Sequence, residues 1–584
     1  ARESTSGGGS ARSRQARREP VRLRVSRADA LPELSFLGVI AGLLAGVVIL
    51  AFRLTVEEMQ SVFLPGGPGD YEHLAATWRL LLPVAGGLAV GLLFQWIPDN
   101  DRRVGVAHIM ERLAYYQGRL PVRNALVQLV GGAVAIITGH SIGREGPSVH
   151  LGAASSNLPA QSLGLPHNSL RVIAACGTAA GIAASFNTPL AGVAFAMEVL
   201  MMEYTVAAFA PVILATVGAT VLTRLVYGGA HVAYHVPPLS LGSMAELPYI
   251  LFVGAMVGVL AGLFIHLVRL FTAAGGAVPP VVRTTLAGLA VGIAALGAPQ
   301  VMGIGDDTVN QILLGHLGIS LLVAIVVLKL LVSTTAVGLG IPGGMIGPSL
   351  FIGAAAGGIF GLFAEQTHIA ASPSGLYALL GMGAMMAGIL QAPLAALLAM
   401  LELTGNPNII FPGMLAVITA TLVAGRVYGR ESVFLALMRA RGLDYRNDPI
   451  AQSLRRVGVA AAMDRSFAVL PRQAPRERIH GELRSNPHWV LVREEGEAPL
   501  LIAAADVARA LTSESQTAVF DLLSIPAVRL HAAPVDMRDN LQEALELMER
   551  SGAEALYVSR VAAPGIQGAY GILTREAIER SYEY

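Results

Sequence analysis

Two glycine- and proline-bearing stretches within apolar sequence most constrain the fold of this chain. In the first, residues 143–147 read Gly-Arg-Glu-Gly-Pro and follow the apolar run 126–138. Glycine leaves backbone N–H groups accessible, and proline is favoured in the first turn of a helix. A helix that begins here would direct its free N–H groups and its positive dipole end toward whatever precedes it. The stretch therefore predicts an anion site with a carboxylate at its mouth, although a tight turn with a surface ion pair would use the same residues.

The same pattern returns about 200 positions later. Residues 343–355 repeat Gly-Pro-Ser and Gly-Ala-Ala at the spacing of the first stretch. Farther along, residues 187–192 followed by Glu198 are echoed by residues 391–396 followed by Glu402. Two halves with matching interrupted helices are typical of a membrane transporter that binds its substrate between the repeats, near the bilayer midplane.

Composition separates this interpretation from a duplicated soluble protein. The 584 residues are 54% hydrophobic and only 14% charged, against about 25% charged residues in soluble domains. We therefore expect a polytopic membrane protein with a smaller polar part. The single cysteine, Cys176, rules out a disulfide framework and a cysteine metal site. Lys329 lies inside an apolar run, so it either faces the protein interior or snorkels to the interface.

Residues 34–440 resemble the CLC family of chloride channels and chloride/proton antiporters. The resemblance is carried by the two glycine-proline stretches and by residues 186–192, Phe-Asn-Thr-Pro-Leu-Ala-Gly. It implies an all-α polytopic membrane protein, an inverted-repeat CLC-type bundle with helices that enter from both sides and stop halfway. It also implies a homodimer with one anion pathway in each subunit.

The chain divides into segments of distinct composition. The N-terminal stretch is rich in arginine, and positive charge before the first span places the N-terminus in the cytoplasm. A signal peptide is not expected, because no small-residue cleavage site follows the apolar stretch. We expect a multi-pass protein of a prokaryotic cell membrane with both termini cytoplasmic. The expected segments are a basic arm at 1–31, a transmembrane domain at 32–442 with repeats at about 80–225 and 280–440, a linker at 443–455, and two small α/β copies at 456–514 and 515–584.

The resemblance assigns roles along the anion pathway. Glu145 is the expected gate, at the outer end. The anion would be held by Gly143, Arg144, Gly146, Met345, Ile346, Phe434, Val104 and Gly105. Two of these positions depart from the family pattern, since Val104 stands in place of a serine and Phe434 in place of a tyrosine. A phenylalanine edge faces an anion more weakly than an O–H donor does, and Phe434 would also fit as a core residue.

The position after Glu198 bears on mechanism. Antiporters of the family commonly carry a second glutamate there, in the proton pathway, and this chain has Val199. Glu198 matches a glutamate that channels and antiporters share, and we expect a structural role for it. The sequence therefore favours a chloride-selective channel gated by Glu145. The alternative is a proton-coupled chloride antiporter, because some family antiporters lack the second glutamate.

The polar C-terminal region resembles a pair of CBS (cystathionine-β-synthase-type) motifs, implying a small cytoplasmic α/β domain. Such pairs often bind adenine nucleotides through a threonine and an aspartate three positions on. The first copy has Asp506 but Ala503, and the second has Thr574 but Ala577. No cofactor is expected to be required, and an adenine nucleotide on this pair is one possibility. A dimerisation and gating scaffold is the other.

Other classes of function find no support in the sequence. No nucleophile constellation, zinc signature or Walker loop is present, so we do not expect an enzyme, and no acidic ring suggests a cation channel. The expected partners are chloride and related small anions, the lipid membrane and a second copy of the chain, with no nucleic acid.

Overall fold

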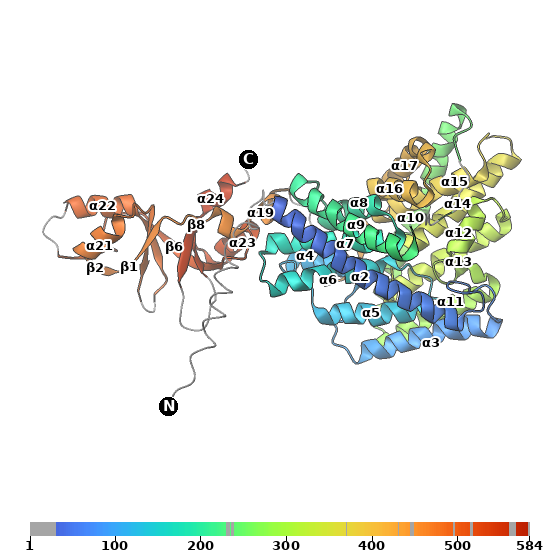
Figure 1. The fold of residues 1–584 in the computed structure, drawn as a ribbon, viewed down its shortest axis with the longest axis horizontal. Helices are drawn as coiled ribbons and strands as arrows, with labels where there is room; N and C mark the ends of the chain where they lie inside the picture. The colour runs from blue at the N-terminus through green and yellow to red at the C-terminus, as the bar shows by residue number, and fades with distance from the viewer. Residues whose placement is uncertain are drawn as a thin grey trace. The chain divides into compact units, whose positions relative to one another are not determined.

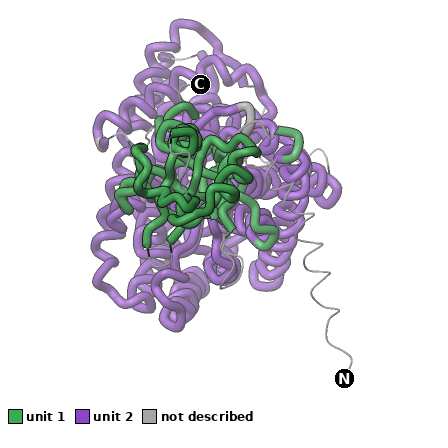
Figure 2. The backbone as a smooth tube through the Cα atoms, turned by 90° about the vertical axis from the view of Figure 1, so that its left-hand side faces the viewer, with its two compact units in different colours: residues 1–33, 162–170, 446–584 green, residues 34–161, 171–445 purple. Residues whose placement is uncertain are grey.

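The structure is a computed structural model in which the chain forms two compact units (Figure 2). Unit 1 comprises residues 1–33, 162–170 and 446–584, and unit 2 comprises residues 34–161 and 171–445. The expected basic arm lies outside the described residues except for Leu31, as do residues 444–448 of the expected linker. The structure describes residues 31–228, 234, 239–369, 371–429, 431–443, 449–494, 497–513, 518–559 and 568–581.

The first half of the helical part contains helices of very unequal length (Figure 1). One of the short ones consists of α8 followed without a break by the π-helix η1. The elements are α2 (Leu31–Phe63), α3 (Ala76–Gln95), α4 (Gly105–Tyr115), α5 (Val122–Ile137), α6 (Glu145–Ser162), α7 (His167–Phe186), α8 (Pro189–Phe195), η1 (Ala196–Met201) and α9 (Val206–Tyr227).

The second half repeats this alternation of long and short helices. Its elements are η2 (Met244–Glu246), α10 (Leu247–Gly275), α11 (Pro280–Gly297), η3 (Pro299–Val301), α12 (Asp306–Leu313), α13 (Ile319–Gly338), α14 (Ile346–Gln366), α15 (Ser374–Leu390), α16 (Pro393–Thr404), η4 (Pro407–Ile409), α17 (Ile410–Tyr428) and α18 (Val433–Ala440).

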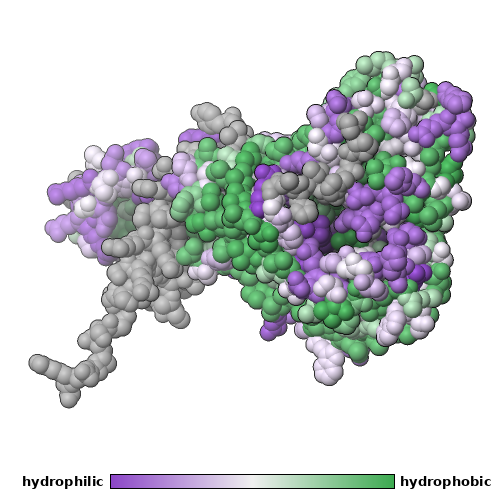
Figure 3. Space-filling view, turned by 45° about the vertical axis from the view of Figure 1, so that its right-hand side comes forward, coloured by the Kyte–Doolittle hydropathy of each residue, from purple (hydrophilic) through white to green (hydrophobic). Residues whose placement is uncertain are grey.

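Length and composition confirm the polytopic membrane class. Among the described residues, 9 helices are long and apolar enough to cross a membrane, since a full span needs about 20 residues. Four apolar helices are shorter, among them Pro189–Met201 and Pro393–Thr404. Hydrophobic residues cover broad parts of the surface of unit 2 seen in Figure 3. The expected fold class, a helical bundle with half-spanning helices, is confirmed.

Glycines allow helices of each repeat to pack at backbone contact. A Cβ added at Gly152 on α6 would lie 2.3 Å from the carbonyl oxygen of Gly177 on α7. In the second repeat, a Cβ at Gly353 on α14 would lie 2.3 Å from the carbonyl oxygen of Gly381 on α15. Small residues that let backbones approach are the usual means of helix packing in membranes. The two repeats therefore use the same close contact at matching places.

The C-terminal part of unit 1 is built from two copies of a β-α-β-β-α pattern. Its 6-stranded sheet has the order β1-β3-β4-β6-β7-β8, in which β1 and β3 are parallel, β6 and β7 are parallel, and the other neighbours are antiparallel. A separate pair joins β2 to β5, so residues 519–521 pair with the first copy. The elements are α19 (Pro449–Arg456), α20 (Val459–Ala462), β1 (Phe467–Pro471), β2 (Gln473–Pro475), α21 (Arg476–Leu483), β3 (Trp489–Arg493), β4 (Leu500–Ala503), α22 (Ala504–Ser513), β5 (Val519–Asp521), β6 (Arg529–Asp536), α23 (Leu541–Ser551), β7 (Ala555–Ser559), β8 (Ala569–Thr574) and α24 (Arg575–Arg580).

The close contact between α6 and α7 gives a test of the packing. We expect Gly152→Ala to lower the melting temperature of the detergent-solubilised protein, because overpacking typically costs about 1–3 kcal/mol. Gly297→Ala is the matched control, since a Cβ there would meet nothing within 4 Å. Melting followed by size-exclusion chromatography measures both. Equal melting temperatures for the two variants would show that α6 and α7 do not pack as described.

Candidate functional site

A short antiparallel bridge joins the two glycine-proline stretches. The Gly143 N–H donates to the Gly344 carbonyl oxygen at 2.9 Å, and the Gly344 N–H donates to the Gly143 carbonyl oxygen at 2.8 Å. Just beyond the bridge, α6 begins at Glu145 and α14 begins at Ile346. The bridge therefore places two helix N-termini, from the two repeats, beside one another.

The Glu145 carboxylate fills the space at these helix starts. Its Oε1 accepts hydrogen bonds from the N–H of Ile346, at short distance, and from the N–H of Gly347, at 3.2 Å. Its Oε2 is buried and accepts no hydrogen bond from the part of the chain that the structure describes. A Cβ at Gly344 would lie 2.1 Å from the carboxyl carbon, so glycine there leaves room for the Glu145 side chain in this position. The side chain is an anion held at a helix N-terminus, where a free anion would also bind.

The register of α14 decides which N–H groups face the carboxylate. Met345 is the N-cap residue of this helix, and the N–H groups that contact Glu145 belong to Ile346 and Gly347. Sequence reasoning named Met345 and Ile346 and missed Gly347. The sequence did contain a signal for Gly347. Pro348 has no N–H, so the two residues before it, Ile346 and Gly347, supply the first free N–H donors of α14. An anion contact of Met345 stays a prediction.

Arg144 points to other partners. Its guanidinium lies 4.0 Å from the Glu57 carboxylate and 4.9 Å from the centre of the Phe186 ring. No hydrogen bond from its side chain to Glu145 occurs among the described residues. Gly146 approaches the other motif closely, since a Cβ there would lie 2.5 Å from the Gly343 carbonyl carbon. Arg144 thus stands beside the site, and Gly146 lets the two motifs meet.

A cavity of about 510 Å³ leads to Glu145. Its lining includes Gly146, Val104, Gly105, Met345 and Phe434. Phe434 also packs edge-on against Phe195, with ring centres 6.3 Å apart. Val104 and Phe434 therefore line the space as predicted from the sequence, and neither offers a hydroxyl donor. Whether an anion contacts them stays a prediction.

The other part of the cavity lining is basic. Arg102, Arg103, Arg283 and Arg441 lie there with one acidic residue, Asp99. Arg102 pairs with Asp99 at 2.5 Å. Arg103 pairs at 2.5 Å with Glu111, a buried residue that does not line the cavity. With Glu145, which also lines the cavity, three carboxylates stand against four guanidinium groups. The net charge is positive, and such clefts concentrate anions.

A histidine pair was missed by the sequence analysis. The Gly105 N–H, expected to face the anion, donates to His150 Nδ1 at 2.9 Å. The His150 ring stacks on the His108 ring, with centres 5.4 Å apart. His108 Nδ1 lies 3.9 Å from Glu111 Oε2. The side chains of His108, His150 and Glu111 are all buried. In the sequence, the only signal for this cluster was that His150 follows Glu145 by five residues.

Glu198 and Glu402 cap helices of the opposite repeat. The Glu198 carboxylate accepts from the N–H groups of Leu394 and Ala395, at 3.1 and 2.7 Å, at the start of α16. The Glu402 carboxylate accepts from the N–H groups of Leu190 and Ala191, at 2.9 and 2.8 Å, at the start of α8.

Val199 follows Glu198 on η1 and is buried. The reciprocal caps give Glu198 a structural role and occupy both of its oxygens.

In the C-terminal region the two predicted nucleotide residues lie at the same kind of junction but at different positions of it, since Thr574 corresponds to Ala503 and Asp506 to Ala577. Thr574 ends β8, and its hydroxyl accepts from the Ala577 N–H at 3.3 Å as the N-cap of α24. Asp506 lies in the first turn of α22 and pairs with Arg509 at 3.1 Å. Both side chains therefore sit where a strand passes into a helix.

These observations define a class: a polytopic membrane protein of inverted-repeat type, with a carboxylate held between the helix starts of its two halves. The sequence profile described as "Voltage gated chloride channel" matches residues 86–425. The chain belongs to this CLC family, whose members are channels and transporters.

Individual proteins agree with the assignment. The chain is 33% identical over 422 residues to the "Putative chloride channel protein ClcB-like" of Ralstonia nicotianae. The aligned region covers 69% of this chain and 96% of that protein.

Two solved structures share the fold. A "slow cyanobacterial Cl-/H+ antiporter" has a TM-score of 0.62 at 23% identity, with 71% of this chain and 99% of that chain covered. A "eukaryotic CLC transporter" has a TM-score of 0.59 at 20% identity, with 93% of this chain and 97% of that chain covered.

Proposed function

We propose that the protein conducts chloride and related small anions across a membrane as a channel whose pathway is closed by Glu145. One observation carries the proposal: the Glu145 carboxylate takes the N–H donors of Ile346 and Gly347 at the end of a cavity lined by arginines. A permeating anion needs the same donors. The side chain and the anion therefore compete for one position.

Protonation would open this gate. A neutral carboxyl group loses most of its attraction for the helix N-terminus, because that attraction depends on negative charge. The side chain then leaves the N–H groups, and an anion replaces it. Acid on the accessible side shifts the population toward the open arrangement.

Uncoupled conduction is favoured by the surroundings of Val199. Proton transfer through a dry apolar region needs titratable groups or water, since an isolated charge there is very costly. Val199 is apolar and buried, and both oxygens of Glu198 are taken by backbone N–H groups. Val104 and Phe434 also lack the hydroxyls expected at the inner barrier of an exchanger.

Proton-coupled antiport is the second candidate. It is supported by His108, His150 and Glu111, three buried titratable side chains beside the inner cavity. Such a cluster offers a route for protons that does not use position 199. The related fold of a chloride/proton antiporter agrees with this candidate.

The wider arrangement is also part of the proposal. The two β-α-β-β-α copies are consistent with a CBS pair, and we propose that it lies in the cytoplasm together with the N-terminus. We also propose that the protein forms a homodimer in a prokaryotic cell membrane, which its bacterial relatives and the usual assembly of the family support. An adenine nucleotide on the CBS pair is supported by Asp506 in the first copy and Thr574 in the second, each of which supplies one half of the expected signature at a strand-to-helix junction.

Glu145→Gln tests the gate. Glutamine cannot ionise, so we expect anion flux into liposomes to rise and to lose nearly all of its pH dependence. Glu58→Gln is the control, because Glu58 is exposed on α2. Chloride efflux measured between acidic and neutral pH gives the comparison. If the Glu145→Gln variant keeps the pH dependence of the parent protein, Glu145 is not the gate.

A reversal-potential measurement distinguishes channel from antiporter. With a fixed chloride gradient across reconstituted bilayers, adding a pH gradient should leave the reversal potential at the chloride value. A shift toward the proton potential, or uphill proton movement driven by chloride, would establish coupling. In that case the loss of coupling on changing His108 or His150 to Phe would assign the proton route to the histidine pair.

Phe434→Tyr tests the second missing hydroxyl. The new O–H points into the cavity and adds one donor to a bound anion, and a hydrogen bond to a charged partner contributes about 1.5–3 kcal/mol. We expect chloride binding in calorimetry to tighten at least several-fold. Phe363→Tyr, on an exposed position of α14, serves as control. Unchanged binding in both variants would remove Phe434 from the anion path.

A further inference from the structure

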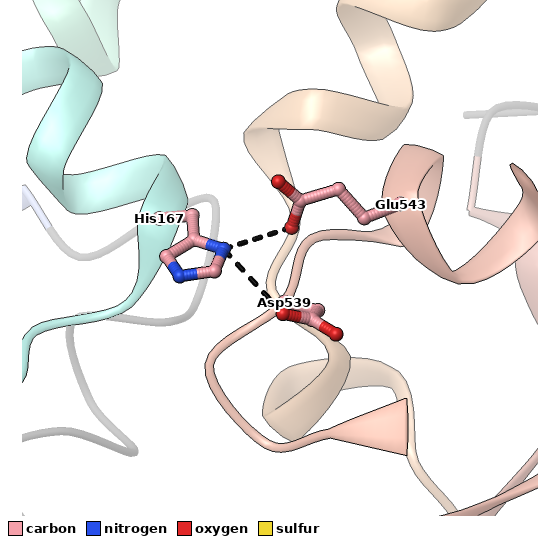
Figure 4. Close-up of side chains that lie close together, drawn as sticks. All are labelled: His167, Asp539 and Glu543. Atoms are coloured by element: carbon pink, nitrogen blue, oxygen red, sulfur yellow. Dashed lines mark hydrogen bonds and ion pairs between the residues drawn. The ribbon is translucent and has the colours of Figure 1, made fainter. Parts of the chain in front are cut away.

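Three ligand-type side chains meet in unit 1 (Figure 4). His167 is the first residue of α7, in the segment 162–170 that belongs to this unit. Asp539 and Glu543 lie at the start of α23. His167 Nδ1 lies 2.8 Å from Glu543 Oε2 and 3.5 Å from Asp539 Oδ1. The three ligand atoms all lie within 4.8 Å of one another.

We propose that His167, Asp539 and Glu543 bind a divalent transition-metal ion of the zinc type. One imidazole nitrogen and two carboxylate oxygens form a donor set that zinc accepts, with bonds of about 2.0–2.2 Å. Tetrahedral bonds of that length separate ligand atoms by about 3.4 Å. The two measured distances bracket this value, so the ion needs only small side-chain movements. Three protein ligands leave a fourth position for water.

Backbone contacts hold the ligands in place. The backbone N–H of His167 donates to the Arg538 carbonyl oxygen at 3.0 Å. Glu543 Oε2 accepts from the Asn540 N–H at 3.0 Å, as part of the capping box of α23. Asp539 Oδ2 accepts from the Asp536 N–H at 3.3 Å, which leaves Oδ1 toward the histidine. Ligands that are oriented by surrounding hydrogen bonds bind metal more tightly than free ones.

The charge and burial of these three side chains fit a bound cation better than a helix cap alone. The His167 side chain is only 3% exposed, and those of Asp539 and Glu543 are 18% and 23% exposed. Arg538, beside Asp539 in the sequence, directs its guanidinium to Asp536 at 2.8 Å. Two carboxylates beside a neutral imidazole carry a charge that a divalent ion neutralises.

The site connects parts of the chain that are far apart in the sequence. His167 and Glu543 are separated by 376 positions. An ion held by both fixes the segment 162–170 against the start of α23. Because the ion binds the folded arrangement and not the separated segments, it stabilises that arrangement as its concentration rises.

Zinc binding to the full-length protein tests the proposal. The purified protein, stripped with a chelator, is titrated with ZnCl₂ by calorimetry and by melting temperature, with MgCl₂ in parallel. We expect one zinc ion per chain at micromolar concentration or below, and a higher melting temperature with zinc but not with magnesium. No saturable binding up to 100-fold excess of zinc would overturn the proposal.

Single variants of the three proposed ligands locate the ion. His167→Gln, Asp539→Asn and Glu543→Gln keep hydrogen-bonding atoms but weaken metal ligation, so each should reduce zinc affinity by more than about tenfold. His488→Gln is the matched control, since His488 forms an exposed pair with Asp464 at 2.7 Å in the same unit. Equal affinity in all four variants would place the zinc elsewhere and refute the site.

A spectroscopic measurement on the unaltered protein covers the case in which a variant does not fold. Co²⁺ added in place of zinc should give the intense visible absorption of a four-coordinate ion, and zinc should displace it. A weak spectrum like that of Co²⁺ in water would contradict ligation by these three side chains.

Discussion

The antiparallel bridge between Gly143 and Gly344 is the contact on which the pathway depends. Its two backbone hydrogen bonds join the repeats and set the starts of α6 and α14 beside each other. Each helix start carries free N–H groups and a positive partial charge. Two such ends together are unfavourable without a negative charge between them. Glu145 supplies that charge in the structure, and in the proposed function a small anion substitutes for it when the side chain leaves.

Half-spanning helices create the same requirement elsewhere in the bundle. A helix that ends within a membrane leaves N–H groups that no water satisfies, at a cost of several kcal/mol each. Glu198 and Glu402 meet this need at the starts of α16 and α8, each from the opposite repeat. These exchanged caps tie the halves together at a second place. The glycine contacts of α6 with α7 and of α14 with α15 add close backbone packing within each half.

In the proposed function, anion recognition depends mainly on the backbone and on distant charge. The N–H groups of Ile346 and Gly347 are fixed by the geometry of α14 and do not depend on side-chain identity. Four arginines line the inner cavity and raise the local anion concentration. Val104 and Phe434 add no hydroxyl donor between these two elements. Attraction over a distance and competition at one carboxylate thus describe how the pathway works.

The sequence by itself determined the membrane class, the two repeats and the central place of Glu145. Apolar length decides which segments can span, and glycine and proline mark helix starts through local backbone geometry, so both are readable along the chain. Only the tertiary structure decided that Gly347 donates to Glu145, that His150 takes the Gly105 N–H, and that Glu198 and Glu402 exchange caps. A shift of one residue in a helix start changes which N–H is free. Contacts across about 200 positions, and that of His167 with Glu543 across 376, leave no local pattern, because they depend on how whole helices pack.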